Sequence, residues 1–211
     1  MQNKPIGIFS GTFDPIHLGH IHLANMMLQI CNLKKIIFIP CAQSPLRKPP
    51  IASPMDRFNM VKLAIAQHNK FFTDDREIKQ GGISYTIKTL KSLQQEHQTS
   101  LALILGSDVF NRFHAWHAWQ KILATVHLLV AKRPGTWEIT NPDSLKLLHQ
   151  HQTTNIQQLQ NKTSGLIYVT DINPLPIAAT EVRTLINTQQ DASSLVAPAV
   201  WQYIGNKQLY T

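Results

Sequence analysis

Two histidines three residues apart follow a glycine-containing turn near the start of the chain. The turn holds Gly11 and Thr12, and the histidines are His17 and His20. Three residues make almost one helical turn, so a helix that begins near Pro15 or His17 would point both imidazoles the same way. That direction leads out of the helix N-terminus, where free N–H groups and the helix dipole favour an anion. The spacing therefore predicts a site for the phosphate chain of a nucleotide.

The chemistry predicted for this site is electrostatic. Imidazoles at a helix start can donate hydrogen bonds to phosphate oxygens and stabilise charge that grows during phosphoryl or nucleotidyl transfer. Gly19, between the histidines, has no Cβ and lets a ligand approach the helix backbone closely. A metal site is the alternative interpretation, but it needs a third and a fourth ligand that this spacing does not supply.

Alternating strands and helices must position these residues. Strands are predicted over the apolar runs 6–10, 35–40, 71–73, 101–105, 126–131 and 165–170. Helices are predicted over 18–31, from Pro54 with Ser53 as its N-cap, over 85–97 with Ser84 as its cap, and over 109–124, 180–187 and 196–204. This pattern predicts an α/β fold, a single doubly wound Rossmann-like domain whose mostly parallel sheet has helices on both faces. Ligands bind such sheets at the carboxyl ends of the strands.

Composition narrows the class of protein. The 211 residues are expected to form one domain, 1–211, with 136–164 as a variable insertion containing one or two short helices. The net charge of +8 is not gathered into a basic block or stripe, so it favours small polyanionic substrates over nucleic acid. Cys31 and Cys41 fit no metal-binding spacing and indicate a reducing compartment, and no apolar run approaches the ~20 residues of a membrane span. We expect a soluble, cytoplasmic protein with no membrane partner, and no oligomeric state is predicted.

The segment from Gly11 to His20 resembles the nucleotidylyltransferase superfamily, whose hallmark is His-x-Gly-His. Further motifs, in order, resemble the bacterial nicotinate-nucleotide adenylyltransferases within it. They are Ser84-Tyr85-Thr86, Leu105-Gly106-Ser107-Asp108 with Trp116 downstream, Ala131-Lys132-Arg133-Pro134-Gly135, and Ala178-Ala179-Thr180-Glu181-Val182-Arg183. Only 136–164 carries no motif, and several motifs in register are far more specific than one short pattern.

The resemblance implies an enzyme of NAD biosynthesis that joins ATP and nicotinate mononucleotide, giving nicotinate adenine dinucleotide and pyrophosphate. The mononucleotide phosphate would attack the α-phosphorus in line, without a covalent enzyme intermediate, because phosphate is already an ionised nucleophile. Catalysis then consists of positioning and charge stabilisation. Mg²⁺ is the implied cofactor, and it would be bound mainly through ATP phosphates and water, with no protein metal ligands.

The resemblance also assigns roles to residues of this chain. The catalytic residues that it implies are His17, His20 and Arg183. The implied ATP-binding residues are Gly11, Thr12, His17, Gly19, His20, Lys48, Asp108, Thr180 and Arg183. The implied nicotinate-mononucleotide-binding residues are Ser10, Thr86, Trp116, His117 and Arg133. Thr180, at an N-cap position, and Arg183 would hold the β- and γ-phosphates, and Trp116 would stack on the pyridine ring.

Simpler roles stay open for three of these residues. Asp108 could cap a helix that starts at Val109 instead of binding ribose hydroxyls. Trp116 could lie on a buried helix face with other aromatic residues, and Arg183 could form a surface ion pair.

Two departures from the family pattern bear on ATP affinity. Leu46 stands where the family usually has His, and Ala178 where it usually has Ser. The alternative functions are a nucleotidylyltransferase with another acceptor, such as nicotinamide mononucleotide or phosphopantetheine, and a non-catalytic nucleotide-binding protein.

Overall fold

The computed structural model describes residues 4–132 and 139–211, which form two compact units. Unit 1 comprises the described residues of Met1–Phe9, Met26–Ile36 and Tyr85–Asn173. Unit 2 comprises Ser10–Asn25, Ile37–Ser84 and Pro174–Thr211. The expectation of one domain over 1–211 stays a prediction, and each unit is considered by itself.

Seven strands form a parallel sheet in the order β3-β2-β1-β4-β5-β7-β6. The strands are β1 (Ile6–Gly11), β2 (Lys35–Pro40), β3 (Phe71–Thr73), β4 (Leu101–Gly106), β5 (His127–Lys132), β6 (Gln152–Thr153) and β7 (Ile167–Asp171). The chain proceeds outward from β1 in both directions, and crossovers between parallel strands are right-handed, so helices lie on both faces of such a sheet. The α/β, Rossmann-like fold predicted from the sequence is confirmed.

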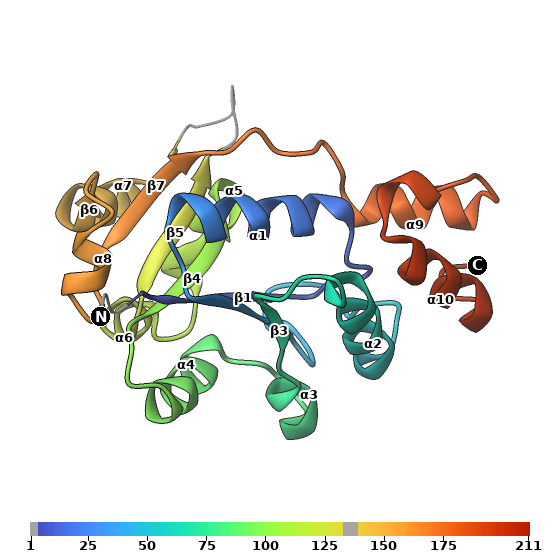
Figure 1. Cartoon of the computed structure of the whole chain (residues 1–211), viewed down its shortest axis with the longest axis horizontal. Helices are drawn as coiled ribbons and strands as arrows, with labels where there is room; N and C mark the ends of the chain where they lie inside the picture. Colours follow the sequence, from blue (N-terminus) through green and yellow to red (C-terminus); the bar gives the residue numbers. More distant parts are fainter. Residues whose placement is uncertain (1–3, 133–138) are drawn as a thin grey trace. The chain divides into compact units, whose positions relative to one another are not determined.

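Unit 1 is built on β4, β5 and β7, which pair in that order and lie side by side in Figure 1. All the apolar side chains of residues 101–105 in β4 are buried, each worth about 1.5–3 kcal/mol for a Leu or Ile. That strand is therefore the centre of the core of the unit. Its helices are α4 (Thr86–Glu96), α5 (Ser107–Phe110), the 3-10 helix η1 (Phe113–Ala115), α6 (Trp119–Thr125), α7 (Pro142–His151) and α8 (Gln158–Asn161).

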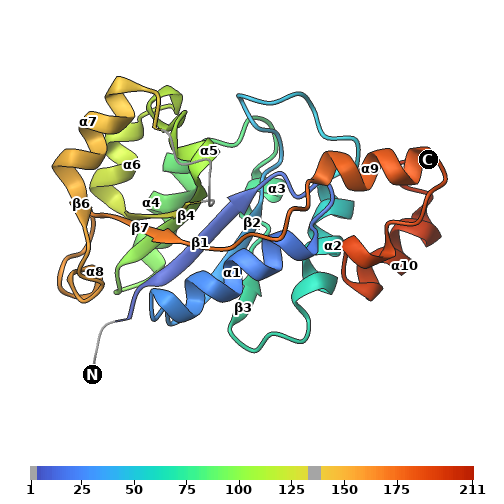
Figure 2. The same ribbon diagram turned by 90° about the horizontal axis from the view of Figure 1, so that it is seen from above.

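Unit 2 packs helices around the carboxyl-terminal parts of β1 and β2. They are α2 (Pro54–Ile65), α3 (Arg76–Gln80), α9 (Ala179–Asn187), the 3-10 helix η2 (Ser193–Leu195), α10 (Pro198–Lys207) and the first part of α1 (Leu18–Ile30). Figure 2 shows α10 beside α2, and Tyr203 of α10 donates from its hydroxyl to Oδ1 of Asp56 in α2 at 2.8 Å. Asp56 also donates its backbone N–H to Ser53 Oγ at 3.1 Å, which confirms Ser53 as the N-cap of α2.

The predicted continuous helix over 109–124 is wrong. The chain forms α5, η1 and α6 there, because two residues leave the helical conformation. Trp116 is extended, with φ −74° and ψ 140°, and Ala118 is left-handed, with φ 55°. The three-residue aromatic spacing instead reflects a local cluster, in which buried Phe113 contacts Trp116 and Trp119.

Two other details of the structure differ from the prediction made from the sequence. Ser84 does not cap α4, because its hydroxyl accepts a hydrogen bond from the backbone N–H of Ala42 at 3.0 Å, and the N-cap position belongs to Tyr85. The described part of 136–164 contains the two short helices α7 and α8, as predicted, and also β6, which was not predicted and pairs in parallel with β7. Among the residues that the structure describes, no helix is long and apolar enough to cross a membrane.

Arg57 of α2 is a fully buried cation that satisfies backbone carbonyls of three separate segments. Its Nη1 donates to the carbonyl of Thr12 at 2.6 Å, its Nη2 to Ala42 at 2.9 Å, and its Nε to Ala52 at 3.3 Å. A buried carbonyl without a donor costs about 1–3 kcal/mol. One side chain therefore supports the chain after β1, the chain after β2 and the residue before the cap of α2.

Arg57→Met should lower the free energy of unfolding by at least about 3 kcal/mol, because three buried carbonyls lose their donor. Urea denaturation followed by circular dichroism measures this change. The control is Arg76→Met, which removes a partly exposed ion pair with Asp74 and should cost about 0–1 kcal/mol. Equal losses in the two variants would contradict the supporting role of Arg57.

Candidate active site

His17 and His20 lie together at the start of α1. Their ring centroids are 3.7 Å apart, with 34° between the ring planes. The backbone N–H of His17 donates to Nδ1 of His20 at 3.2 Å, and the carbonyl of His17 accepts from the backbone N–H of His20 at 2.9 Å. His17 thus occupies the N-cap position and His20 the third position of the helix, as in a capping box. The prediction that both imidazoles lie on one side of the helix start is confirmed.

The backbone contact also selects the position of the proton on His20. A neutral imidazole has one donor and one acceptor nitrogen. Because Nδ1 accepts from the backbone of His17, the proton of the neutral ring lies on Nε2. His20 is half-buried, whereas His17 is buried. A neutral N–H donor at a helix start suits a phosphate oxygen, and the contact with phosphate itself stays a prediction.

Two glycines leave room for the rings around this pair. A Cβ on Gly19 would lie 3.0 Å from Nδ1 of His17, and a Cβ on Gly11 would lie 3.1 Å from Cζ of Phe13. Phe13 has a φ of 48° and meets His20 edge to face, with ring centroids 5.1 Å apart. Gly19 therefore makes room for the His17 ring itself. The sequence alone suggested another reason for this glycine, the close approach of a ligand.

Arg183 and Thr180 lie close together on α9, as predicted. Nη2 of Arg183 donates to Oγ1 of Thr180 at 3.3 Å, and Nη1 donates to the backbone carbonyl of Asp14 at 2.5 Å. Arg183 thus connects α9 to the turn that leads into His17. The predicted cap is wrong, because Ala178 is the N-cap residue and Thr180 is the second residue of the helix.

The other predicted site residues of unit 2, which are Ser10 for the mononucleotide and Thr12 and Lys48 for ATP, differ in exposure. Ser10 and Thr12 are half-buried, at and just after the end of β1, and Lys48 is exposed in the loop between β2 and α2. The thiol of Cys41 contacts Oγ1 of Thr12 at 3.8 Å, and burial raises the pKa of that thiol, which keeps it a donor. The main chain and the hydroxyl of Thr12 are therefore both fixed by neighbours.

In unit 1, two of the residues predicted to bind the mononucleotide, Thr86 and His117, lie at or beside the start of α4. The ring of His117 lies 4.8 Å from the ring of Tyr85, the residue just before Thr86. Trp116 is half-buried and packs on Phe113, with ring centroids 5.6 Å apart. The backbone N–H of Trp116 donates to the carbonyl of Phe113 at 3.0 Å, while the amide of His117 donates to no other residue within 4–132 and 139–211. Of the two amides considered for a carboxylate, that of Trp116 is therefore already used within the protein.

Asp108 is exposed in the first turn of α5, directly after β4. The alternative role as a cap of a helix from Val109 is wrong, because α5 starts at Ser107, its N-cap is Gly106 and no side-chain hydrogen bond caps it. A Cβ on Gly106 would lie 2.7 Å from Oδ1 of Asp108, so the carboxylate lies over the backbone at the strand end. Arg133, the remaining predicted residue, lies outside the described residues.

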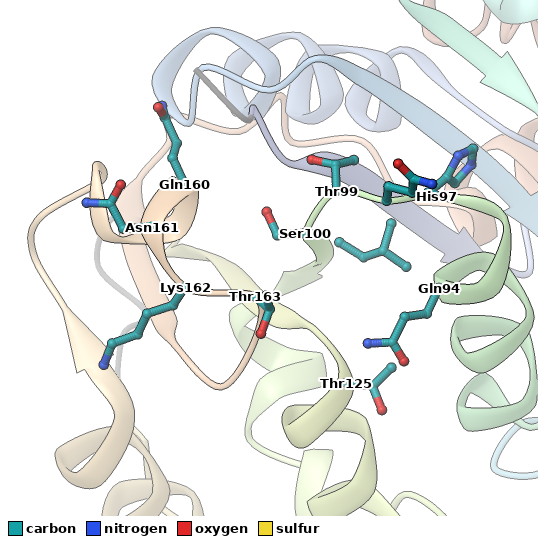
Figure 3. Close-up of a pocket in the computed structure, with 11 residues that line it drawn as sticks. Gln94, His97, Thr99, Ser100, Thr125, Gln160, Asn161, Lys162 and Thr163 are labelled. Atoms are coloured by element: carbon teal, nitrogen blue, oxygen red, sulfur yellow. The ribbon is translucent and has the colours of Figure 1, made fainter. Parts of the chain in front are cut away.

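Unit 1 also contains a polar pocket that is separate from these residues (Figure 3). It is lined by the end of α4, the end of α6 and the segment after α8, including Gln94, Thr125 and Lys162. Ser100 and Leu101, at the amino end of β4, also line it. The predicted ligand residues follow the carboxyl ends of strands, so this pocket is not the predicted acceptor site.

Comparison with known proteins identifies the family. Residues 8–185 match the family described as cytidylyltransferase-like. A protein of Coxiella burnetii named as a probable nicotinate-nucleotide adenylyltransferase is 41% identical over 209 residues, covering 97% of each chain. One of Cellvibrio japonicus with the same name is 40% identical over 208 residues, covering 97% of this chain and 98% of its own. This chain belongs to the nicotinate-nucleotide adenylyltransferase family.

The fold of a solved structure agrees with the family. A nicotinic acid mononucleotide adenylyltransferase of Plasmodium falciparum, in complex with NaAD, superposes with a TM-score of 0.75 over 98% of this chain and 97% of its own. Its sequence identity is 20%, so the likeness concerns the fold.

Three residues of unit 2 around the histidines were not predicted to matter. Arg57, Asp14 and Tyr210 make the hydrogen bonds that hold the turn before His17. Arg57 lies on a helix with no local motif, and Tyr210 is 196 residues from Asp14. Asp14 lies in the Gly11 to His20 segment and Tyr210 in the segment 195–210, which also resembles the family, but neither pattern indicated this contact.

Gly19→Ala should displace the imidazole of His17, because the added Cβ would lie 3.0 Å from Nδ1 and 3.1 Å from Cε1. Ala favours a helix by about 1 kcal/mol over Gly, so we expect a moved ring rather than an unfolded protein. Histidine ring ¹H–¹⁵N spectra measure the change. In the control Gly205→Ala, on α10, the new Cβ meets no atom within 4 Å and the His17 resonances should stay in place. Unshifted His17 resonances in Gly19→Ala would show that the ring is not held there.

Proposed function

We propose that this protein transfers the adenylyl group of ATP to nicotinate mononucleotide, forming nicotinate adenine dinucleotide and pyrophosphate in NAD biosynthesis. The observation that carries the proposal is the His17–His20 pair at the start of α1, in a chain of this family. Relatives that share about two fifths of the sequence over nearly the full length bear the name of that activity.

Unit 2 would bind the reacting phosphates. His20 would donate from Nε2 to a phosphate oxygen, and His17 lies against it at the same helix start. Arg183 and Thr180, with the main chain at Gly11 and Thr12, would bind the β- and γ-phosphates. Such donors stabilise charge that develops on the α-phosphate and on pyrophosphate, and the ionised acceptor phosphate needs no general base. Lys48, exposed on its loop, would add a further cation.

Unit 1 would bind the acceptor and the ribose. The indole of Trp116 offers a stacking surface for the pyridine ring, and the amide of His117 offers a donor to its carboxylate. Thr86 is proposed as a further polar contact in this unit, and Arg133, which lies outside the described residues, keeps its predicted role. Ser10, which belongs to unit 2, also keeps its predicted role toward the mononucleotide. Asp108 would accept hydrogen bonds from the ATP ribose, since its carboxylate is exposed at the end of β4.

Mg²⁺ would enter the site already bound to ATP. Among the described residues, no group of three or more His, Cys, Asp or Glu side chains could hold a metal ion, and both oxygens of Asp14 already accept hydrogen bonds. The ion would be bound through phosphate oxygens and water, and would neutralise charge on the leaving pyrophosphate. The substrates ATP and nicotinate mononucleotide fit a cytoplasmic enzyme, which stays our expectation for its location.

A pyrophosphate-release assay with MgATP and one acceptor at a time tests the function. Nicotinate mononucleotide should be the best of three acceptors, ahead of nicotinamide mononucleotide and phosphopantetheine, because its carboxylate can accept from the amide of His117. Release with none of them would favour a non-catalytic nucleotide-binding protein. Preference for the amide form would overturn the choice of substrate.

His20→Ala should lower kcat by about 10²–10³-fold, the usual effect of removing one preorganised donor to a developing charge. Losing the contact to the backbone of His17 should change the free energy of unfolding by only about 1 kcal/mol. His22→Ala, two residues further along the same helix, is the matched control and should keep wild-type kcat. If His20→Ala lost stability as severely as turnover, His20 would be a structural residue.

A further inference from the structure

The carboxylate of Asp14 is buried and accepts hydrogen bonds from two distant segments. Oδ2 accepts from the backbone N–H of Ile51 at 2.8 Å, and Oδ1 accepts from the N–H of Ala52 at 3.1 Å. Oδ1 also accepts from the hydroxyl of Tyr210 at 2.8 Å. Both oxygens are therefore occupied by neutral donors, in a side chain that is 6% exposed.

Arg183 lies beside this carboxylate but does not form a close ion pair with it. Its Nη1 is 4.0 Å from Oδ2 of Asp14 but 2.5 Å from the backbone carbonyl of the same residue. An arginine next to a buried carboxylate usually forms a close, often bidentate pair with N···O distances of about 2.7–2.9 Å. Three neutral donors, one on Oδ2 and two on Oδ1, share the negative charge that would otherwise draw the guanidinium closer.

We propose that Tyr210 is a positioning residue that keeps Arg183 available to the nucleotide phosphates by satisfying the carboxylate of Asp14. The proposal rests on the proposed function, in which Arg183 binds the β- and γ-phosphates of ATP. Without the hydroxyl of Tyr210, Oδ1 keeps only the N–H of Ala52, and the guanidinium moves from the carbonyl toward the carboxylate. An arginine paired with Asp14 in that way is withdrawn from the phosphates.

The end of the chain is folded so that this contact is made. Two residues after α10, Gln208 and Tyr210, have positive φ values of 50° and 68°. The backbone N–H of Leu209 donates to Ile204, and the hydroxyl of Thr211 donates to the carbonyl of Gln208. Non-glycine residues in that region cost of order 1 kcal/mol or more and persist where surrounding contacts hold them. The buried hydroxyl of Tyr210 is the contact that holds this turn against Asp14.

The hydroxyl remains a donor throughout the working pH range. Burial, followed by the negative charge of Asp14, raises the pKa of Tyr210 well above its ordinary value. The charged groups that face it are the Asp14 carboxylate and the guanidinium groups of Arg183 and Arg57. Tyr210 therefore stays protonated, and it donates to Asp14 without adding a second negative charge beside Arg183.

Unit 2 contains a matched control for this contact. Tyr203 also donates its hydroxyl to an aspartate, Oδ1 of Asp56, at the same 2.8 Å. That pair joins α10 to α2, and neither residue contacts Asp14 or Arg183 in the described structure. Tyr203→Phe and Tyr210→Phe thus each remove a hydroxyl donor from an aspartate, and Tyr203→Phe also removes the acceptor of Asn59 Nδ2 at 3.1 Å.

Calorimetric titration of the full-length protein with ATP, without an acceptor, tests the proposal. Tyr210→Phe should raise the Kd for ATP by about five- to tenfold, Tyr203→Phe by less than twofold, and Arg183→Gln by about tenfold or more, as expected for a lost hydrogen bond to a charged group. Tyr210→Phe should add nothing in the Arg183→Gln background, because its effect passes through Arg183. Equal effects of the two tyrosine variants, or additive effects of Tyr210→Phe and Arg183→Gln, would overturn the proposal.

A second measurement covers the case in which Tyr210→Phe folds poorly. The side-chain Nε–H resonance of Arg183, assigned with Arg183→Gln, should shift in the folded fraction of Tyr210→Phe without any ligand, and an unshifted resonance would contradict the proposal. Turnover of the wild type with nicotinate mononucleotide is measured separately. If the wild type turns over but Tyr210→Phe binds ATP with wild-type affinity, only this inference is wrong. If Tyr210→Phe binds ATP more weakly but the wild type shows no turnover, only the proposed function is wrong.

Discussion

The buried carboxylate of Asp14 is the group on which the geometry of unit 2 depends. It lies three residues before His17, and its oxygens accept from the backbone at Ile51 and Ala52 and from the hydroxyl of Tyr210. A buried charge is stable only when its hydrogen-bonding capacity is met, so these donors are a condition of folding as well as a result of it. The segment before α1, the segment before α2 and the end of the chain all contact this side chain. These contacts fix the turn before His17 and therefore the position of the histidine pair.

Arg57 supplies the complementary half of the same constraint. Asp14 accepts from backbone N–H groups, whereas Arg57 donates to backbone carbonyls, and the two side chains act on shared segments. Ala52 donates its N–H to Asp14 and offers its carbonyl to Arg57, and the carbonyl of Thr12 also accepts from Arg57. Backbone groups in such irregular segments have no strand or helix partner, so buried side chains must satisfy them. One acid and one base therefore hold the loops that surround the histidines.

Local signals in the sequence were sufficient for the strands and for the histidine pair, and insufficient for these supports. Continuous apolar runs identified β1, β2 and β4, and Ser53 followed by Pro54 located the start of α2. The helix predicted over 109–124 was wrong because aromatic spacing alone does not reveal that Ala118 is left-handed. The contact of Tyr210 with Asp14 spans 196 residues and has no local pattern, and only the tertiary structure brings the two together.

The same supports would let the proposed phosphate site be made with few cations. The contact of the His17 backbone with Nδ1 of His20 leaves the proton of the neutral ring on Nε2, so His20 is a donor without a second proton. The helix start adds backbone N–H groups, which also need no charge. Arg183 is a partly exposed cation at the same turn, and in the proposed function its contact with the carbonyl rather than the carboxylate of Asp14 would leave its charge available to an anion. A close ion pair at that point would cancel the field that the other groups create.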